Sequence, residues 1–436
     1  MTACPRPRFC AIDFGTSNSA IAIAQDPAQG AGMALVAVEN NHVTLPTAAF
    51  YLAEGPGLQH LPRKVGRAAI AAYVEGTEGR LMRSMKSVLG SSLMDQPTDI
   101  GAGRTIRFQE VIGSFLRHLK DLAERQHGGP IDQVVMGRPV HFVDDDPVRD
   151  SQAQSALEDA ARAVGFGEIR FQYEPLAAAF HYEAGIESEQ RVLVADIGGG
   201  TSDFSVVRVG PQRRALPDRR EDVLANHGLH IAGTDFDRRI ELAGILRELG
   251  YGALGPSRQG QPPREVPSRV YFDLATWHLI NPLYRPQRLA ELRAMKGDYA
   301  DERHHTRLMR VLGDQLGHDL IGRAEQAKIE LAQGGQTTID LGLVERGLRL
   351  SMEAAQADNA LREDLERIVG AAAETLTRAG VGPHQIDAIY FTGGSTGLRP
   401  LTRALEALCP QARAVHGERL ASVATGLGID ARRCFG

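Results

Sequence analysis

The chain has 436 residues, of which 43% are hydrophobic and 24% charged, and at roughly 150 residues per domain its length predicts two or three domains. This composition is typical of a globular protein and excludes the fibrous, disordered and disulfide-scaffold classes. A net charge of −5 gives no general attraction to nucleic acid or to anionic lipid.

Cysteine usage and hydropathy favour a reduced, cytoplasmic compartment. The cysteines form no CxxC pair and lie near the two ends of the chain, at Cys4, Cys10, Cys409 and Cys434. The longest apolar runs are too short to span a bilayer, and the first residues lack the apolar stretch of a secretory signal. We therefore expect a cytoplasmic protein that contacts neither nucleic acid nor membrane.

The first predicted element is a β-hairpin over residues 10–23. Its turn contains Gly15, Thr16 and Ser17, and Asp13 precedes it. A turn rich in glycine and hydroxyl groups presents several backbone N–H groups to one point, which suits a phosphate, and an aspartate beside it suits a hydrated divalent cation. One such hairpin alone is equally typical of an ordinary tight turn.

The next elements indicate α/β structure. Residues 132–136 predict a strand, and residues 151–164 a helix with its N-cap at Asp150 or Ser151. Glu174 and Pro175 open a second helix, where the carboxylate either caps the helix or orients a water molecule in a site. Proline and glycine concentrate in four predicted loops, at residues 26–32, 96–103, 211–220 and 255–268.

A second hairpin, over residues 192–207, repeats the plan of the first. Asp196 precedes a turn of Gly198, Gly199, Gly200 and Thr201, and lies 183 residues after Asp13. Two matching hairpins weaken the tight-turn interpretation and predict a duplicated α/β architecture with two lobes of similar design.

The last third of the chain predicts helices at residues 361–379 and 401–408 and a strand at residues 386–392. The strand runs into Gly393, Gly394 and Ser395, which favours a nucleotide-contacting loop between a strand and a helix. The pattern matches neither the P-loop nor the dinucleotide fingerprint, and an ordinary turn is an equally good interpretation.

Taken in order, these motifs resemble the ATPase domain of the 70-kDa heat-shock (DnaK-type) chaperones, within the actin and sugar-kinase superfamily. Residues 12–19 and 196–203 resemble the two phosphate loops of that family, and residues 391–396 its adenosine loop. Residues 174–180 and 421–426 are similar to its two connecting segments, and residues 232–237 to its glycine–aspartate turn.

The resemblance implies a duplicated, actin-like (ribonuclease H-like) α/β ATPase fold with a central nucleotide cleft. Lobe I would comprise residues 1–190, with an inserted subdomain at about 51–107. Lobe II would comprise residues 191–436, with an insertion at about 238–310. The length resembles that of the short, YegD-like relatives, so we expect the chain to lack the C-terminal peptide-binding β-sandwich.

The resemblance also implies ATP or ADP with Mg²⁺ as cofactors. Asp13 and Asp196 would hold the metal through water and act in catalysis together with Lys86, Glu174 and Asp203. The phosphate-binding residues would be Gly15, Thr16, Ser17, Asn18, Gly198, Gly199, Gly200 and Thr201. The other nucleotide-binding residues would be Gly233, Glu325, Lys328, Gly393, Gly394, Ser395 and Arg399.

Lys86 is the candidate for the lysine that the family places near the γ-phosphate. The chain has only five lysines, and Lys64, Lys86 and Lys120 fall in the right interval. Residues 85–90 are similar to the Lys-Arg-Leu-Ile-Gly pattern of the family, whereas the alternative for Lys86 is a solvated surface lysine.

The predicted ribose and adenine contacts differ from those of the family. Glu325 and Lys328, three residues apart on one helix, are as typical of a surface ion pair as of a ribose site. Ile329 and Gly397 stand where the family has arginines that stack on adenine, and Arg399 is close enough in sequence to replace one of them.

The predicted function is that of an ATP-binding, slowly ATP-hydrolysing chaperone-like protein, with attack of water on the γ-phosphate. We expect a monomer whose partners are the nucleotide and an unidentified client protein or co-chaperone. The alternatives are a small-molecule (sugar-type) kinase, an actin-like assembling or scaffold protein, and a nucleotide-binding regulator without hydrolysis.

Overall fold

The computed structural model describes residues 8–25, 32–53, 62–91, 94, 96–101, 103–143, 146–214, 216, 218–257, 262–417 and 421–436. Cys4 lies outside these ranges, as do parts of the predicted insertions and parts of all four predicted loops. Of the predicted loop at residues 96–103, Pro97–Gly101 instead forms strand β8, because these residues pair with the strand that follows them.

The strands of the described residues are β1 (Phe9–Phe14), β2 (Asn18–Ala24), β3 (Met33–Leu35), β4 (Thr44–Pro46), β5 (Ala48–Leu52), β6 (Arg63–Val65), β7 (Gly79–Arg83), β8 (Pro97–Gly101), β9 (Arg104–Arg107), β10 (Gln133–Arg138), β11 (Glu168–Tyr173), β12 (Gln190–Ile197), β13 (Ser202–Val209), β14 (Val223–Leu229), β15 (Gln336–Asp340), β16 (Arg349–Glu353), β17 (Ala388–Thr392) and β18 (Arg413–His416).

The α-helices are α1 (Arg67–Val74), α2 (Phe108–His127), α3 (Pro147–Ala163), α4 (Glu174–Ala184), α5 (Gly233–Ala243), α6 (Arg269–Leu274), α7 (Ile280–Leu283), α8 (Pro286–Ala294), α9 (Glu302–Gly313), α10 (Gly317–Leu331), α11 (Ala354–Arg378), α12 (Arg399–Leu408) and α13 (Ser422–Phe435). Within the described ranges, no helix is both long enough and apolar enough to cross a membrane.

The two larger sheets repeat one topology. One has the strand order β11-β10-β1-β2-β3, with β4 also pairing with β2, and the other has the order β14-β13-β12-β17-β18. Each sheet contains one antiparallel hairpin, β1–β2 or β12–β13. On its other side, the first strand of the hairpin begins a row of parallel pairs, β1-β10-β11 or β12-β17-β18. Both predicted hairpins are therefore confirmed, whereas the boundary between lobes at residue 190 stays a prediction.

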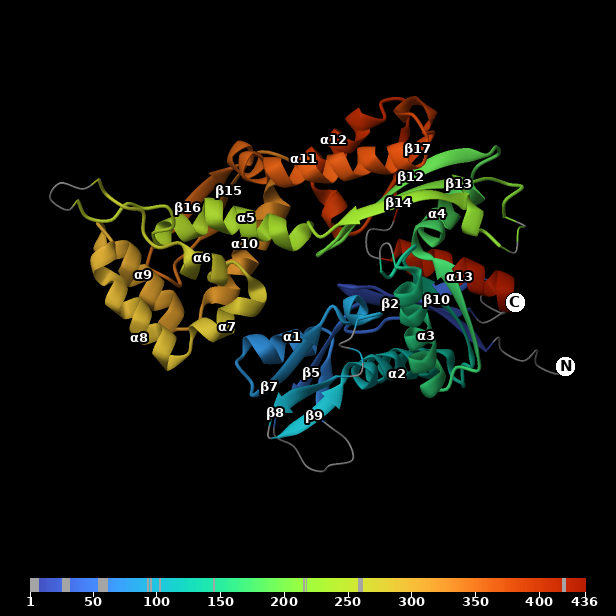
Figure 1. The fold of residues 1–436 in the computed structure, drawn as a ribbon, viewed down its shortest axis with the longest axis horizontal. Coiled ribbons are helices and arrows are strands. Elements are labelled where there is room, and N and C mark those ends of the chain that lie inside the picture. Colours follow the sequence, from blue (N-terminus) through green and yellow to red (C-terminus); the bar gives the residue numbers. More distant parts are fainter. Residues whose placement is uncertain are drawn as a thin grey trace.

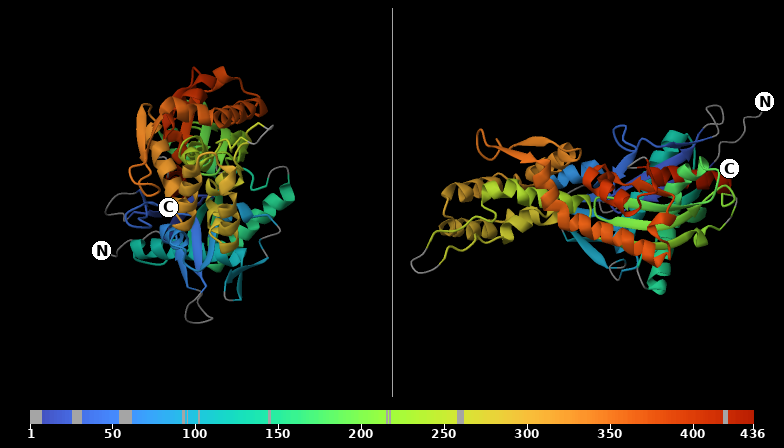
Figure 2. Two further views of the ribbon diagram at one scale, coloured as in Figure 1. Left: turned by 90° about the vertical axis from the view of Figure 1, so that its left-hand side faces the viewer. Right: turned by 90° about the horizontal axis from the view of Figure 1, so that it is seen from above.

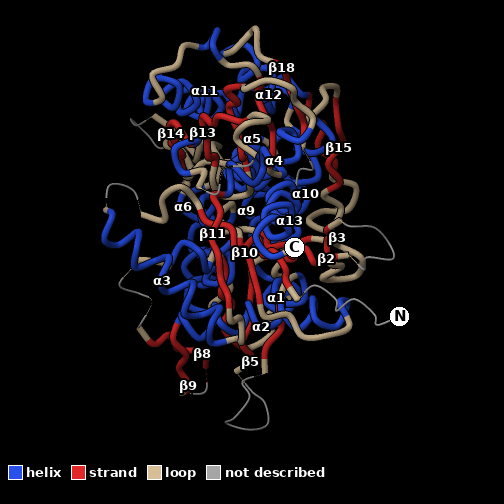
Figure 3. Tube along the Cα trace, turned by 90° about the vertical axis from the view of Figure 1, so that its right-hand side faces the viewer, coloured by secondary structure: helices blue, strands red, loops and turns tan. Residues whose placement is uncertain are grey.

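The sheets and helices are stacked in layers because side chains alternate along each buried strand. In β1, Cys10 and Ile12 pack against α2 and α3, whereas Ala11 packs against α4 and α13. In β12, Val194 packs against α4 and α13, whereas Leu193 faces the core that contains α5 and α11. Helices α4 and α13 thus lie between the two sheets, as Figures 1 and 3 show.

Helix α3 begins four residues before its predicted start. Its N-cap is Asp146, whose carboxylate accepts the backbone N–H of Arg149 at 3.0 Å, and Pro147 is its first residue. Asp150, one of the two predicted caps, instead accepts Arg138 Nη2 at 2.8 Å. A proline directly after an aspartate fixes this helix start.

Two outer regions contact each other although they are far apart in the sequence. Sheet β6-β5-β7 with α1 forms one region, and helices α6 to α10 form the other (Figure 2). Tyr73 of α1 stacks on Trp277 with ring centroids 4.7 Å apart, and the guanidinium of Arg83 lies 4.5 Å from the indole centroid. This contact joins the regions of the two predicted insertions, whose bounds stay predictions.

The two central helices cross closely at Gly426. A Cβ atom at this position of α13 would lie 1.7 Å from the carbonyl oxygen of Ala177 in α4, so that only glycine permits this approach. The side chains around the crossing are buried, including Leu176, Ala178 and Leu427.

We therefore predict that Gly426→Ala lowers the free energy of unfolding by about 1–3 kcal/mol, because the two helices have to move apart. Gly370→Ala in α11 is the matched control, since a Cβ there meets no atom within 4 Å and alanine favours a helix. Chemical denaturation of both variants tests this. Equal unfolding free energies for Gly426→Ala and the parent protein would contradict the close crossing.

Candidate functional site

A cleft of about 770 Å³ lies where the hairpin turns of the two larger sheets approach each other, and helices α4, α5 and α10 also contribute to its walls. Of the residues predicted for the site, those lining the cleft are Asp13, Gly15, Thr16, Ser17, Asn18, Lys86, Glu174, Asp196, Gly198, Gly199, Thr201, Asp203, Gly233, Glu325, Lys328, Gly393, Gly394 and Ser395. Gly200 and Arg399 are not among the lining residues.

The turn after β1 is held from behind by Thr47. Its hydroxyl donates to the carbonyl of Gly15 at 2.8 Å, and its backbone N–H donates to the carbonyl of Ser17 at 2.9 Å. Because a trans peptide directs a carbonyl and the following N–H to opposite sides, the amide of Thr16 points away from Thr47. A Cβ at Gly15 would lie 2.2 Å from the carbonyl oxygen of Asn18, which explains the glycine.

The turn after β12 is held in the same way. The carbonyl of Gly198 accepts the hydroxyl of Ser395 at 2.6 Å, and the carbonyl of Gly199 accepts both the N–H and the hydroxyl of Thr234 at 2.8 Å. The amides of Gly199 and Gly200 therefore point away from α5. An oriented row of amide N–H groups of this kind can bind an anion.

Carboxylates from four elements converge in the cleft. Asp13 lies at the end of β1, and Glu174 is the first residue of α4. Asp196 and Asp203 lie opposite each other across the β12–β13 pair. Lys86 Nζ contacts Glu174 Oε1, and the two side chains are 8% and 17% exposed. Lys86 is therefore not a solvated surface lysine, whereas its role near a γ-phosphate stays a prediction.

The crowding of these carboxylates changes their protonation. Burial raises the pKa of Asp13 to about 8, with repulsion from Glu174 adding to the effect and Lys86 opposing it. Burial, together with repulsion from Asp203 and Glu174, raises the pKa of Asp196 to about 7. Desolvation by the surrounding protein atoms also raises the pKa of Asp203, although its side chain is exposed to the cleft. A bound cation would relieve this repulsion.

Local structure brings Lys86 and Glu174 together although 88 residues separate them. Ser84 adopts a left-handed conformation (φ 52°) that turns the chain after β7, and Met85 is fully buried, so that Lys86 is directed into the cleft. Gly137 in β10 leaves room for Glu174, because a Cβ there would lie 3.1 Å from Glu174 Cγ.

Lys328 does not form the surface pair that its spacing from Glu325 suggested. Its Nζ lies 2.7 Å from Asp237 Oδ1 and 3.4 Å from the carbonyl of Gly233, both in α5. Burial raises the pKa of Asp237 to about 6, although Lys328 opposes the shift. Lys328 therefore fastens α10 to α5 at the wall of the cleft.

The predicted adenosine loop forms the short turn Gly394–Gly397 after β17. Gly393 adopts a left-handed conformation (φ 86°), and a Cβ there would lie 2.3 Å from the carbonyl oxygen of Ile197. Ile329 is 57% exposed although it is apolar, and it lines the cleft with Leu398. Arg399 is exposed and does not line the cleft. Its backbone N–H donates to the carbonyl of Ala332.

Further lining residues were not predicted from the sequence. Residues 139–142 follow β10, and the position of a loop after a parallel strand was the available signal. Asp237 lies within the motif at residues 232–237, but no sequence pattern predicts its pairing with Lys328, 91 residues later. Asn226, His230 and Gln333 also line the cleft, and no motif marked them.

The donor set suits a hydrated divalent cation. Carboxylate oxygens are the ligands that Mg²⁺ prefers, and it commonly uses one or two of them and keeps several water ligands. Within the described ranges, no group of three or more histidine, cysteine, aspartate or glutamate side chains is arranged to hold a metal ion by itself. The pair Asp13 and Asp196 is the one that the sequence analysis selected.

Two sheets of one topology, with a glycine-rich hairpin turn of each facing a shared cleft, are consistent with an actin-like ATPase fold. Residues 98–243 match the model of the Hsp70 protein family. The chain is also 27% identical, over 411 residues, to a chaperone protein DnaK of Mycoplasmoides gallisepticum. The similarity covers 92% of this chain and 55% of that relative, so the chain spans about half the length of the curated relative that it matches. The comparisons confirm the resemblance to the ATPase domain of DnaK-type Hsp70 proteins.

One further carboxyl group lies beyond the cleft wall. Glu241, one turn after Asp237 in α5, is fully buried, and neither of its oxygens has a hydrogen-bond partner among the described residues. Burial, followed by repulsion from Asp237, raises its pKa well above the usual value. Folding therefore disfavours the ionised form of this side chain.

We predict that Glu241→Gln makes the protein less sensitive to rising pH. A carboxyl whose pKa is raised by folding stabilises the protein fully only below its unfolded pKa of about 4.3, and the stability then falls by up to about 1.4 kcal/mol per pH unit. The variant removes this slope, so its advantage over the parent should grow between pH 5 and 8.

Chemical denaturation at several pH values measures the effect. Glu366→Gln, which changes an exposed glutamate of α11, is the matched control and should follow the parent protein. Parallel pH profiles for Glu241→Gln and the parent would show that Glu241 is not held neutral.

Proposed function

We propose that this chain is an ATP-binding, slowly ATP-hydrolysing protein of the DnaK chaperone type. The observation that carries the proposal is the convergence, in one cleft, of two glycine-rich turns with the Asp13, Asp196 and Lys86–Glu174 side chains. The similarity to DnaK supports it. The chaperone activity, the client protein and any co-chaperone are likewise proposals.

The two turns would bind the β- and γ-phosphates of the nucleotide. The amides of Thr16 and Gly199 point away from the groups that hold the turns and belong to residues that line the cleft, so they would be available to phosphate oxygens. The hydroxyls of Ser17 and Thr201 line the same cleft. These contacts are fixed before a ligand arrives, so little reorganisation accompanies binding.

Asp13 and Asp196 would hold Mg²⁺ through its water ligands. When bound, the ion would supply positive charge against the phosphates. Both aspartates have to be ionised for this role, and the cation itself would favour the ionised forms. Asp203, on the other strand of the second hairpin, would accept a hydrogen bond from the same shell of water.

Lys86 and Glu174 would orient the attacking water. Their contact places a donor and an acceptor side by side in the cleft. Water would attack the γ-phosphorus as the bond to the leaving ADP oxygen breaks, a reaction in which positioning and charge neutralisation dominate. We expect slow turnover, since the pair forms a closed contact and must open to admit the water.

The apolar side chains of Ile329 and Leu398 would contact the nucleotide base. Gln333 Nε2 donates to the carbonyl of Gly397 at 3.3 Å, and this bond joins the segment directly after α10 to the turn after β17. An apolar wall of this kind gives less orientation than a stacked arginine, so base selectivity should be modest.

We predict that Lys86→Ala lowers the single-turnover rate of Mg-ATP hydrolysis by about 10²-fold or more, because a fixed positive charge beside the γ-phosphate is lost. Lys64→Ala, which removes an exposed lysine of β6, should leave the rate unchanged. Isothermal titration with Mg-ATP measures binding to each variant separately.

Two outcomes would reject the proposal: no binding of Mg-ATP to the parent protein, or unchanged hydrolysis by Lys86→Ala. Phosphorylation of a sugar in a substrate panel would favour the kinase alternative. Nucleotide-dependent sedimentation at micromolar protein concentration would favour the assembling alternative.

A further inference from the structure

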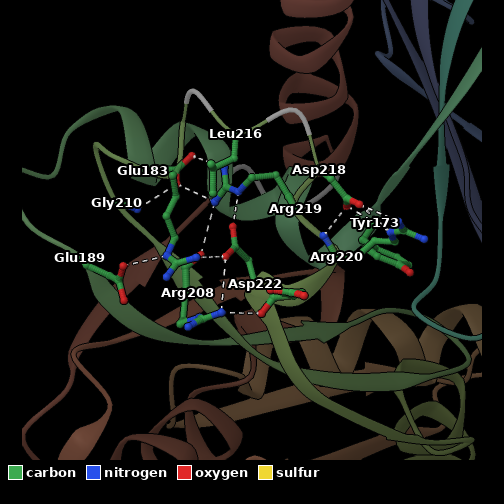
Figure 4. Close-up of polar contacts among 12 residues, drawn as sticks. Tyr173, Glu183, Glu189, Arg208, Gly210, Leu216, Asp218, Arg219, Arg220 and Asp222 are labelled. Atoms are coloured by element: carbon green, nitrogen blue, oxygen red, sulfur yellow. Dashed lines mark hydrogen bonds and ion pairs between the residues drawn. The ribbon is translucent and has the colours of Figure 1, made fainter.

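A cluster of ion pairs with a buried centre lies between α4 and the segment that follows β13 (Figure 4). We call it the Arg219 cluster, and its members are Glu183, Glu189, Arg208, Arg213, Arg219 and Asp222. Arg219 Nη2 lies 2.8 Å from Glu183 Oε1, and Arg219 Nε contacts Asp222. The side chains of these three residues are 1%, 4% and 2% exposed.

The cluster is balanced in charge, with three arginines and three carboxylates. Arg213 contacts Asp222 and places its Nε 2.8 Å from Glu189 Oε2, and Arg208 lies 3.9 Å from Asp222. The guanidinium of Arg219 also lies 5.5 Å from the ring centroid of Phe180 in α4. Because removal of one member leaves a buried charge unpaired, the members are interdependent.

The cluster joins the end of α4 to the end of β13. Glu183, in the last turn of α4, also accepts the backbone N–H of Gly210 at 2.9 Å, and Gly210 directly follows β13. Arg214 donates to the carbonyl of Ile186 at 2.8 Å and to that of Glu183. The segment after β13 thus binds one carbonyl in the last turn of α4 and one just beyond the helix.

The opposite ends of these two elements lie in the cleft. Helix α4 has 11 residues and begins at Glu174, so that it spans roughly 16 Å. Strand β13 has 8 residues and begins beside Asp203, so that it spans roughly 26 Å. Both elements therefore run between the cleft and the Arg219 cluster.

We propose that the Arg219 cluster is a positioning device for the cleft, because it fixes α4 against β13. Through these two elements it would set the place of Glu174 relative to Asp196 and Asp203. Among the described residues, the contacts of Arg219 include none that lines the cleft, so it is a positioning residue and not a catalytic one. This inference rests on the proposed function.

The test compares Arg219→Lys with Arg220→Lys in the full chain. Lysine keeps the charge but replaces the planar fork with one point of contact, so it cannot bind Glu183 and Asp222 in the same way. Arg220 is the adjacent arginine, 74% exposed and paired with Asp218, and is the matched control. Circular dichroism and thermal unfolding establish that each variant is folded.

We expect folded Arg219→Lys to bind Mg-ATP within about threefold of the parent, because the phosphate turns are intact. Its single-turnover hydrolysis rate should fall about tenfold or more, since misplacement of a catalytic group costs rate more than affinity. Arg220→Lys should match the parent within about twofold in both. A merely structural role would lower the unfolding temperature and leave the rate per folded molecule unchanged, and that result would overturn the proposal.

Two further measurements cover a variant that does not fold. Glu183→Gln keeps the shape of the side chain and removes its charge, and it should show the same loss of rate without loss of affinity. The Gly210 amide N–H donates a hydrogen bond to the carboxylate of Glu183. In the parent protein, Mg-ADP should slow hydrogen exchange at this amide. Unchanged exchange at Gly210 would overturn the proposal even if both variants fail to fold.

The controls separate the two hypotheses. A parent protein that hydrolyses ATP at the same rate as Arg219→Lys would reject the positioning role and leave the proposed function standing. A parent protein that neither binds nor hydrolyses ATP would reject the proposed function, and the positioning role with it.

Discussion

The close crossing of α4 and α13 is the constraint on which the rest of the structure depends. These helices form the layer between the two larger sheets. Gly426 lets their backbones approach more closely than any other residue would allow. The spacing of the sheets follows from this approach. The two hairpin turns of the cleft lie at the ends of strands from these sheets, so their separation follows from it as well.

The cleft brings ionisable side chains from different elements close together. Asp13 and Asp196 come from different sheets, yet they are close enough for each to be affected by Glu174 and Lys86. Burial and mutual repulsion disfavour the ionised forms of these carboxylates, so their presence lowers the stability of the folded protein. Proteins tolerate such conflicts chiefly at sites where a ligand resolves them. The stabilising contacts of the layered core therefore hold together a group of carboxylates that repel one another.

The sequence predicts those features that depend on neighbouring residues. Both hairpins could be predicted because strand alternation and turn residues are local patterns, and the strand at residues 386–392 was found as β17 for the same reason. The start of α3 was misplaced because the competing signal of Asp146 and Pro147 lies just outside the periodic segment. Contacts between distant residues have no such pattern. Lys328 was selected by resemblance, but its pairing with Asp237 instead of Glu325 depends on how α5 packs on α10. The Arg219 cluster lies partly in a segment that was predicted only as a loop, and its partners come from α4 and β13.

The distribution of lysine and arginine follows the same physical division. Of 49 basic residues only five are lysines, and two of these, Lys86 and Lys328, line the cleft. A lysine ammonium is a compact charge on a flexible stem, so it can move with a ligand or a water molecule. An arginine guanidinium is planar, stays charged when buried, and binds two carboxylates in fixed directions. Arg219 has this role between Glu183 and Asp222, where a fixed geometry is required. The chain thus has arginine at the Arg219 cluster, where α4 and β13 are held together, and lysine at Lys86, where the site has to adjust, although Lys328 also joins two elements, α10 and α5. This is the arrangement expected if the cluster sets the geometry and the cleft carries out the chemistry.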